Sequence, residues 1–329
     1  MIGTDPRVDR ALQRATEAGR RAGFDVEGAA VTRVRNSIHV ELPYAGVIAR
    51  VEDADWMALA ARQVVVAGVW AAQGAPVPVL VRPQLQSFVF DDAAVTLWQR
   101  LDGGATADLT VLGSTVRKLH DATRGINLTQ VHRLEPFADI EACVDSPPSW
   151  LADEDRDEIA HRYRRLRLWW DSESSDDPLG VGLVHGGVHR ENTLVTDEHG
   201  VILVDLEDAG VGPVSWDLVP LAVGVHRYGD PPEEFQKFVT GYGVDPCRWS
   251  GFERMCGLYE LSVSGWAIRC AAVAPRIARE AALRVAGLLG RSREAWTMLR
   301  AAGGASPGGY GSLDSQPLAG TGFGGRSGK

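Results

Sequence analysis

The spacing of apolar residues changes along the chain from a helical period to a strand period. Near the amino terminus, Val8, Leu12 and Ala15 fall on one side of a helix, with arginines elsewhere. Residues 37–42 alternate strictly between polar and apolar, as a half-buried strand requires. The elements expected in this half are helices over 4–23 and 54–73 and strands over 37–42, 47–51, 86–90 and 94–101. Together they predict an antiparallel sheet with an amino-terminal helix and one internal helix, the latter opened by the acidic residues Glu52, Asp53 and Asp55.

The pattern after Gly103 and Gly104 is mostly helical. Helices are expected over 109–122, 151–170, 232–242 and from 249 to about 300. The exception is the stretch 183–204, where a short apolar strand, a polar loop and a two-stranded hairpin follow one another. From Gly303 the composition is rich in Gly, Ser and Pro, which predicts a flexible tail.

The net charge of the chain limits the kinds of molecule that it is expected to bind. The 329 residues carry 34 Lys and Arg against 43 Asp and Glu, a net charge of −9. This balance argues against a nucleic-acid-binding face and leaves room for cationic or neutral small molecules. A basic run within 151–170 contains Tyr163, but the acidic first half of that segment favours a solvated helix face over a nucleic-acid site.

Nothing in the sequence predicts a membrane or metal-ribbon protein. The longest uncharged stretch, 64–81, is interrupted by Gly74, Pro76 and Pro78, which break a membrane helix. The four cysteines are far apart and match neither a disulfide framework nor a zinc ribbon. We therefore expect a cytoplasmic protein that binds neither membranes nor nucleic acid.

The chemically informative segment follows the predicted strand that begins at 183. Residues 185–191 form a polar loop, and the hairpin after it brings Asn192 and Asp205 to neighbouring strand ends. Two hard oxygen ligands on adjacent strands can hold a magnesium ion that keeps its waters and bridges substrate phosphates. On this pattern alone, a surface hairpin whose Asn and Asp only cap turns is an equally open interpretation.

The spacing of this segment resembles the catalytic segment of the aminoglycoside phosphotransferase and choline kinase family. The family pattern is H-G-D-x-x-x-x-N followed by a strand that ends in Asp. Here residues 185–192 are HGGVHREN and the strand ends at Asp205. Residues 212–218, GPVSWDL, match the family's G-P-x-x-x-D-L continuation, and 95–101 resemble the interlobe hinge. The similarity extends over about residues 25–300.

The resemblance implies an α+β, bilobal protein-kinase-like fold that binds ATP or GTP with Mg²⁺. It implies a β-rich N-lobe over 1–96, a hinge over 97–103, a helical C-lobe over 104–302 and a tail over 303–329. By position, Asn192 and Asp205 would hold the metal ion.

The same resemblance assigns further roles. His185 would brace the catalytic loop, and Asp217 would fix backbone amides. Arg50 would contact the nucleotide phosphates. The remaining nucleotide contacts would come from the strand pair around Asn36 and Ser37, which covers the phosphates, and from the backbone of Gln99, Arg100 and Leu101, which receives the base.

The match fails at the catalytic position itself, because the family's aspartate is replaced by Gly187. General-base assistance is worth roughly 10²- to 10⁴-fold in rate. Three explanations are open: a base supplied by His189, Glu191, Glu207 or Asp208, a pseudokinase that binds without turnover, or an engineered or accidental change from aspartate. A second departure is Gln63, which aligns with the family's helix glutamate and can hydrogen-bond Arg50 but not ion-pair with it.

These observations predict a small-molecule phosphotransferase that moves a γ-phosphoryl group to a hydroxyl. By resemblance, the acceptor is an antibiotic or a related metabolite, and the acidic balance favours a cationic one. Candidate acceptor-binding residues are Glu260, Trp266 and the region from Asp230 to Glu234, together with Glu207 and Asp208. The alternative is a nucleotide- or ligand-binding protein without efficient catalysis. The sequence contains no Walker A motif, dinucleotide fingerprint or hydrolase nucleophile elbow.

Overall fold

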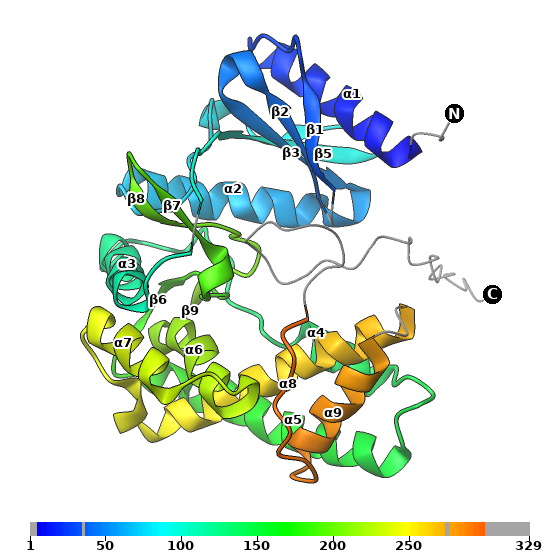
Figure 1. Cartoon of the computed structure of the whole chain (residues 1–329), viewed down its shortest axis with the longest axis vertical. Helices are drawn as coiled ribbons and strands as arrows, with labels where there is room; N and C mark the ends of the chain where they lie inside the picture. Colours follow the sequence, from blue (N-terminus) through cyan, green and yellow to red (C-terminus); the bar gives the residue numbers. More distant parts are fainter. Residues whose placement is uncertain (1–4, 35–36, 105, 274–276, 300–329) are drawn as a thin grey trace, which may run out of the picture.

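The structure is a computed structural model that describes residues 5–34, 37–104, 106–273 and 277–299. Figure 1 shows a sheet with α1 at one end of the molecule and a larger group of helices at the other end, with α2, β7 and β8 between them. This is the α+β, bilobal arrangement that the sequence predicts. The tail expected over 303–329 lies outside the described residues.

An antiparallel sheet forms the smaller lobe. Its strands lie in the order β1-β2-β3-β5-β4, and every neighbouring pair is antiparallel. Their bounds are β1 (Ala30–Val34), β2 (Ile38–Leu42), β3 (Val47–Asp53), β4 (Phe88–Val89) and β5 (Ala93–Gln99). The hydrophobic pattern does not predict β1, because this edge strand has no buried residue and so carries little hydrophobic signal.

The helix α1 (Pro6–Arg21) covers one face of this sheet. Asp5 caps it by accepting a hydrogen bond from the Arg7 amide at 2.9 Å, which satisfies a donor that the first turn leaves free. The small residues Ala11, Ala15 and Ala18 are buried, so the helix lies close to the sheet. Alternation along β2 buries Ile38, Val40 and Leu42 in the same core, as the strand pattern predicts.

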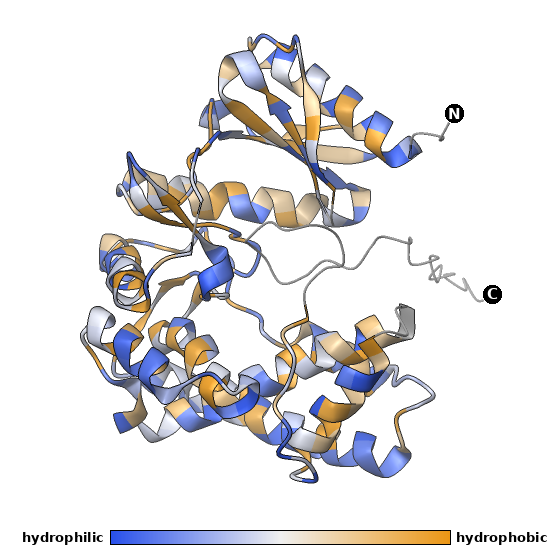
Figure 2. Cartoon of the chain, in the orientation of Figure 1, coloured by the Kyte–Doolittle hydropathy of each residue, from blue (hydrophilic) through white to orange (hydrophobic). Residues whose placement is uncertain are grey.

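The second helix, α2 (Met57–Ala72), belongs to the smaller lobe by sequence but packs into the larger core. Val66, Ala67 and Trp70 are fully buried among residues of the C-terminal half. Figure 2 shows α2 as a mostly apolar helix. No helix in the described parts of the chain is long and apolar enough to span a membrane.

The acidic opening expected for this helix is wrong in one respect. A short 3₁₀ turn over Ala54–Trp56 precedes α2, and Asp53 lies in β3 rather than at the helix start. Glu52 lies in β3 as well. Its carboxylate is 2.5 Å from Nε of Arg50. It therefore acts as a buried ion-pair partner.

The larger lobe is built mainly from helices. They are α3 (Leu109–Ala122), α4 (Ala138–Asp145), α5 (Asp153–Glu173), α6 (Val219–Val223), α7 (Pro232–Tyr242), α8 (Ser250–Val273) and α9 (Ala278–Leu288). α3 and α7 cross at two glycines, because a Cβ on Gly113 would lie 2.1 Å from the Phe238 carbonyl oxygen and one on Gly241 would lie 1.9 Å from that of Thr110. Only glycine permits this close approach.

Two small antiparallel ribbons complete the larger lobe. They are β6 (Val181–Val184) with β9 (Gly210–Pro213), and β7 (Thr193–Thr196) with β8 (Gly200–Leu203). The second ribbon is the predicted hairpin. β9 is not predicted, since its sequence Gly-Val-Gly-Pro has turn residues rather than strand formers.

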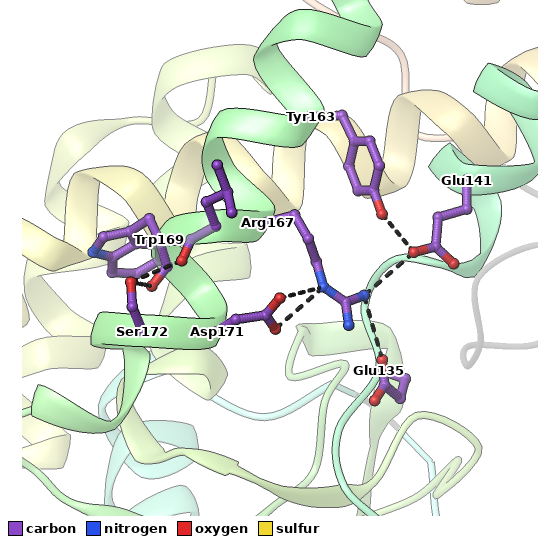
Figure 3. Close-up of polar contacts among 8 residues, drawn as sticks. Glu135, Glu141, Tyr163, Arg167, Trp169, Asp171 and Ser172 are labelled. Carbon is purple, nitrogen blue, oxygen red and sulfur yellow. Dashed lines mark hydrogen bonds and ion pairs between the residues drawn. The ribbon is translucent and has the colours of Figure 1, made fainter.

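The basic run of α5 attaches this helix to its neighbours. The Arg167 guanidinium lies 3.0 Å from Asp171 and 3.2 Å from Glu141, and it stacks 4.2 Å from the centre of the Phe137 ring. Tyr163 donates a 2.5 Å hydrogen bond to the same Glu141 (Figure 3). The expectation of a solvated face therefore holds only in part, because this portion of the face is committed to internal ion pairs.

Candidate active site

A polar loop between β6 and β7 meets the segment that follows β8. The hairpin register pairs Thr193 with Leu203, and the amide of Val204 donates a 2.9 Å hydrogen bond to the carbonyl of Asn192. The hairpin thus brings Asn192 and Asp205 to the same end of two paired strands. This is the juxtaposition that the sequence predicts from the positions of these residues in the pattern.

These two side chains leave a pair of buried oxygens without a partner. Nδ2 of Asn192 donates a 2.9 Å hydrogen bond to the Gly187 carbonyl. The amide oxygen, Oδ1 of Asn192, therefore points away from that carbonyl. Within the described residues, Oδ1 of Asn192 and Oδ1 of Asp205 accept no hydrogen bond. Asp205 also has a positive φ of 68°, a conformation that is costly for a residue other than glycine.

This donor set fits a hard divalent cation. Buried polar atoms are nearly always satisfied, so two unpartnered oxygens facing one end of a hairpin indicate a missing ligand. Mg²⁺ keeps several waters and needs only one or two protein oxygens beside substrate phosphates. The described residues contain no cluster of three or more His, Cys, Asp or Glu side chains that could hold a metal ion, so a dedicated all-protein cage is not part of this region.

Asp217 fixes the first residues of the loop. Its carboxylate accepts hydrogen bonds of 2.7 Å from the amides of His185 and Gly186 and lies 2.8 Å from Nε2 of His120. The side chain is fully buried. His120 in turn contacts the Tyr242 hydroxyl at 3.0 Å, so the network links the loop to α3 and α7.

His185 ties the loop to the segment that follows β8. Its Nε2 lies 3.0 Å from the Val204 carbonyl, and its Nδ1 accepts from the Gly187 amide at 3.4 Å. Because a carbonyl only accepts, the ring must carry its proton on Nε2. Burial lowers the pKa of His185, which favours this neutral form. One ring nitrogen thus bonds within the loop, and the other bonds to the residue that follows β8.

Gly187 is buried, but its surroundings leave room for a side chain. A Cβ on Gly187 would meet nothing closer than 3.6 Å, at Nδ2 of Asn192 and at Oδ2 of Asp208. Its φ lies outside the left-handed region. Neither space nor backbone conformation therefore requires a glycine at this position.

Arg50 reaches the site from the other lobe. It pairs with Glu52 on its own strand and with Glu207, two residues after Asp205. Burial alone would lower the pKa of Arg50, but Glu207, Glu52 and Asp205 together raise it. The guanidinium is therefore a fixed positive charge beside the two unpartnered oxygens.

The expected hydrogen bond between Gln63 and Arg50 is absent. Gln63 is buried, and its Nε2 has no partner within the described residues. Sequence reasoning missed Glu52, although the strand period carried a signal: residues 50 and 52 of one strand share a face. Glu52, on the same strand as Arg50, thus provides the ion-pair partner that the resemblance assigns to a residue of the helix.

The two acidic residues that follow Leu206 differ in their surroundings. Burial, followed by repulsion from Asp205, raises the pKa of Glu207, and its carboxylate is held by Arg50. Desolvation, followed by repulsion from Asp205, raises the pKa of Asp208 to about 6. The Asp208 side chain is nevertheless exposed, and it makes no hydrogen bond or ion pair with any residue that the structure describes.

The segment expected to receive the base lies at the end of β5. The amides of Gln99 and Arg100 already donate to the carbonyls of Val79 and Gly46, at 2.9 and 2.8 Å. The amide of Leu101 has no hydrogen-bond partner within the described residues, so it is the donor that this segment offers to a ligand. Arg100 is held on the surface by Glu41 and Asp102.

The strand pair expected to cover the phosphates is described in part. Ser37 immediately precedes β2, and its hydroxyl lies 3.3 Å from Nε2 of His39. Asn36 lies outside the described residues. The structure thus places Ser37 at the turn end of the β1–β2 pair.

The candidate acceptor residues separate into two groups. Arg190 of the loop lies 3.4 Å from Glu234 of α7, so the region from Asp230 to Glu234 borders the loop. Glu260 instead is buried between Arg162 and Arg227, at 3.3 and 2.7 Å. Trp266 packs against the apolar core. These contacts give Glu260 and Trp266 structural roles.

A separate surface groove lies away from the loop. It has a volume of about 760 Å³ and is bordered by α5, α8 and α9, with both acidic and basic side chains in its lining. None of its lining residues belongs to the segment 185–205. The groove is therefore not part of the candidate active site.

Solved structures of small-molecule kinases share this arrangement. The microcompartment-associated aminopropanol kinase matches with a TM-score of 0.60 at 18% identity, over 86% of this chain and 99% of that chain. A choline/ethanolamine kinase family protein from Mesorhizobium loti matches with a TM-score of 0.58 at 19% identity, over 86% and 94%. Spectinomycin phosphotransferase, solved with ADP and spectinomycin, gives 0.56 at 14% identity, over 84% and 93%. At these identities the likeness shows a shared protein-kinase-like fold.

The sequence comparisons define the family. No curated protein matches the chain significantly. The profile of the phosphotransferase enzyme family matches residues 34–258, which is more than half of the chain. This chain therefore belongs to the phosphotransferase enzyme family.

Proposed function

We propose that this protein is a phosphotransferase that moves the γ-phosphoryl group of ATP or GTP to a hydroxyl of a small molecule. The observation that carries the proposal is the pair of buried, unpartnered oxygens on Asn192 and Asp205. They would hold Mg²⁺, which when bound neutralises charge on the transferring phosphoryl group. Arg50 would hold the phosphates from the other lobe.

The rest of the chain's contribution is positioning. The Leu101 amide would donate to the base, and Ser37 with Asn36 would close over the phosphates. His185 would keep the loop in place through its two hydrogen bonds. Phosphoryl transfer has a loose transition state, so positioning and electrostatics supply most of the catalysis.

The acceptor would bind on the acidic side of the loop. Asp208 is exposed there, and Asp230 lies close enough to Glu191 and Glu234 that their charges add to the desolvation that raises its pKa. Such a surface attracts a cation. We therefore propose a cationic hydroxyl compound, an antibiotic or a related metabolite, as the acceptor.

A nucleotide-binding protein without turnover is the second candidate. The observation that favours it is Gly187, which has no side chain to orient or deprotonate a hydroxyl. This candidate shares the nucleotide and metal sites with the first. The two candidates differ only in that the binding protein would show no measurable phosphate transfer.

Calorimetry with nucleotide and Mg²⁺ tests both candidates. Wild-type protein is expected to bind ATP or GTP more tightly with Mg²⁺ than with EDTA. The change Asp205→Asn should weaken the Mg²⁺-dependent binding by at least about 10- to 100-fold, the loss typical even of residues that only support a metal ligand. Phosphate transfer then separates the enzyme from the binding protein.

Asp197→Asn is the matched control, because Asp197 lies in the turn at the far end of the same hairpin. It makes the same charge change and should leave binding as in wild type. A folded wild-type protein that binds no nucleotide in the presence of Mg²⁺ would refute the proposed function. Equal affinities for the wild type and Asp205→Asn would refute the metal assignment.

A further inference from the structure

The carboxylate of Asp208 lies next to the position where a side chain at residue 187 would begin. Its Oδ2 is 3.6 Å from a Cβ built on Gly187, an ordinary van der Waals distance. The same Cβ would lie 3.6 Å from Nδ2 of Asn192. A carboxylate is thus present beside the loop at the place where the sequence lacks one, but it comes from the segment after β8.

The backbone around Asp208 is fixed against the loop. Gly186 has a φ of 85°, and a Cβ on it would lie 2.2 Å from the carbonyl oxygen of Asp208. Only glycine allows these two segments of the backbone to approach this closely. Trp216 adds a 3.1 Å hydrogen bond from its ring nitrogen to the Gly186 carbonyl, so the Gly186 side of this contact is held.

Apart from the proposed metal ligand Asp205 and the acceptor-side Asp230, three other acidic or basic groups near the loop are already engaged. Glu207 pairs with Arg50 from the other lobe. Glu191 and His189 pair with each other at 3.1 Å. Asp208 is the member of this set whose carboxylate is exposed and makes no hydrogen bond or ion pair with the described part of the chain.

We infer that Asp208 is the catalytic residue that replaces the missing aspartate at position 187, orienting the acceptor hydroxyl and accepting its proton. This inference rests on the proposed function. The hydroxyl oxygen forms a bond to the γ-phosphorus as its proton passes to the Asp208 carboxylate. The bond from the γ-phosphorus to the β–γ bridging oxygen breaks, and the nucleoside diphosphate leaves with that electron pair.

Relocating the carboxylate tests this inference. The four proteins to compare are the wild type, Asp208→Asn, Gly187→Asp and the double variant Gly187→Asp/Asp208→Asn. Position 187 accepts the new side chain because no atom lies within 3.4 Å of its Cβ and its φ is not left-handed. Release of ADP from ATP is measured with choline, aminopropanol, spectinomycin and streptomycin as acceptors, and with water alone.

Asp208→Asn is expected to lower kcat by about 10²- to 10⁴-fold. Its affinity for Mg²⁺-nucleotide, measured by calorimetry, should stay within about twofold of wild type. The double variant should recover most of the lost rate, which a merely structural role of Asp208 would not produce. Asp197→Asn is the control for the charge change and should keep the wild-type rate.

Three results would overturn the inference. The first is a wild-type kcat in Asp208→Asn. The second is a folded, nucleotide-binding double variant with no recovered rate. The third is a wild type that binds nucleotide but transfers no phosphate, even to water, while Gly187→Asp alone gains transfer. A failure of the proposed function itself is distinct, since it appears in calorimetry as a loss of nucleotide binding before any rate is measured.

Discussion

The four positions 205–208, which follow β8, hold three carboxylates, and burial together with the repulsion among them raises the pKa of Glu207 and Asp208. Asp205 has a left-handed φ and a buried oxygen with no partner among the described residues. Glu207 pairs with Arg50, whereas Asp208 makes no ion pair with any residue in the described part of the chain. Strained and unpaired groups of this kind persist where the surrounding structure holds them, and they cluster at functional sites.

Replacing Asp208 should therefore stabilise the metal-free fold at neutral pH. The pKa of Asp208 is raised from 3.8 to about 6, so the folded protein binds a proton more readily than the unfolded chain. The ionised carboxylate costs stability above pH 6, and this cost disappears as the pH falls from about 6 towards 3.8. Asp208→Asn should raise Tm at pH 7.5 by about 1–3 °C, a small effect because the group is exposed.

Thermal unfolding of the wild type and Asp208→Asn at pH 7.5 and pH 4.5, in EDTA, measures this difference. The gain in Tm should be present at the higher pH and largely lost at the lower one. A variant less stable than wild type at pH 7.5 would show that Asp208 supports the fold, contrary to this prediction. Asp197→Asn again serves as the control for the charge change.

At the scale of elements, the sequence pattern locates the strongly periodic pieces and misses those that depend on neighbours. Helices α3 and α7 have the predicted bounds, and the hairpin of β7 and β8 lies where expected. The short helix α4 is absent from the prediction, and so is β9, because few residues and turn-rich composition leave little periodicity. Their positions are set by tertiary contacts.

The contacts of the candidate site likewise fall into those that the sequence pattern predicts and those that it does not. The spacing of Asn192 and Asp205 along a hairpin is enough to bring them together, so local pattern predicts this part of the site. The partners of Arg50 are not predictable in the same manner, since Glu207 comes from the other lobe and is 157 residues away in sequence. Contacts between distant segments depend on how the lobes pack.

The buried carboxylate of Asp217 joins several elements, and removing it should destabilise the whole C-lobe. It accepts from two loop amides and contacts His120 of α3, which contacts Tyr242 of α7. Asp217→Ala leaves these donors buried without an acceptor, at about 1–3 kcal/mol for each unsatisfied group. We expect the free energy of unfolding to fall by about 3–5 kcal/mol.

Urea denaturation compares Asp217→Ala with Asp121→Ala. Asp121 is a partly exposed carboxylate on α3, next to His120. It pairs with Arg117 and Arg124, and its loss should cost about 1 kcal/mol or less. Equal costs for the two variants would contradict the role given to Asp217. A large cost for Asp217→Ala alone would support it.

At the scale of the whole molecule, the described residues form two separate hydrophobic cores. One core lies between α1 and the sheet, and the other contains α2 together with the C-terminal helices. The lobes are linked by the chain after β5 and by a 2.8 Å hydrogen bond from the Leu203 amide to the Pro76 carbonyl. The pair of Arg50 with Glu207 adds an ionic link across the site.

This link should compete with nucleotide phosphates for Arg50. A phosphate that binds the Arg50 guanidinium must either displace Glu207 or share the guanidinium with it. The wild-type protein therefore loses part of the free energy of nucleotide binding. Glu207→Gln removes the competing charge and the repulsion between carboxylate and phosphate. Without Mg²⁺, the variant should bind ADP more tightly by about fivefold, which corresponds to a partly exposed ion pair worth about 1 kcal/mol.

Calorimetry of ADP binding in EDTA isolates this effect, because any part that Glu207 plays in metal binding is then silent. Glu198→Gln, in the exposed turn of the β7–β8 hairpin, makes the same charge change away from Arg50 and should leave the affinity unchanged. Amide hydrogen exchange in β3 should rise in the unliganded Glu207→Gln variant and return to the wild-type level with ADP, because the phosphate then replaces the lost ionic link. Unchanged or weaker ADP binding by Glu207→Gln would mean that the ion pair holds Arg50 in place for the nucleotide, which is the opposite of competition.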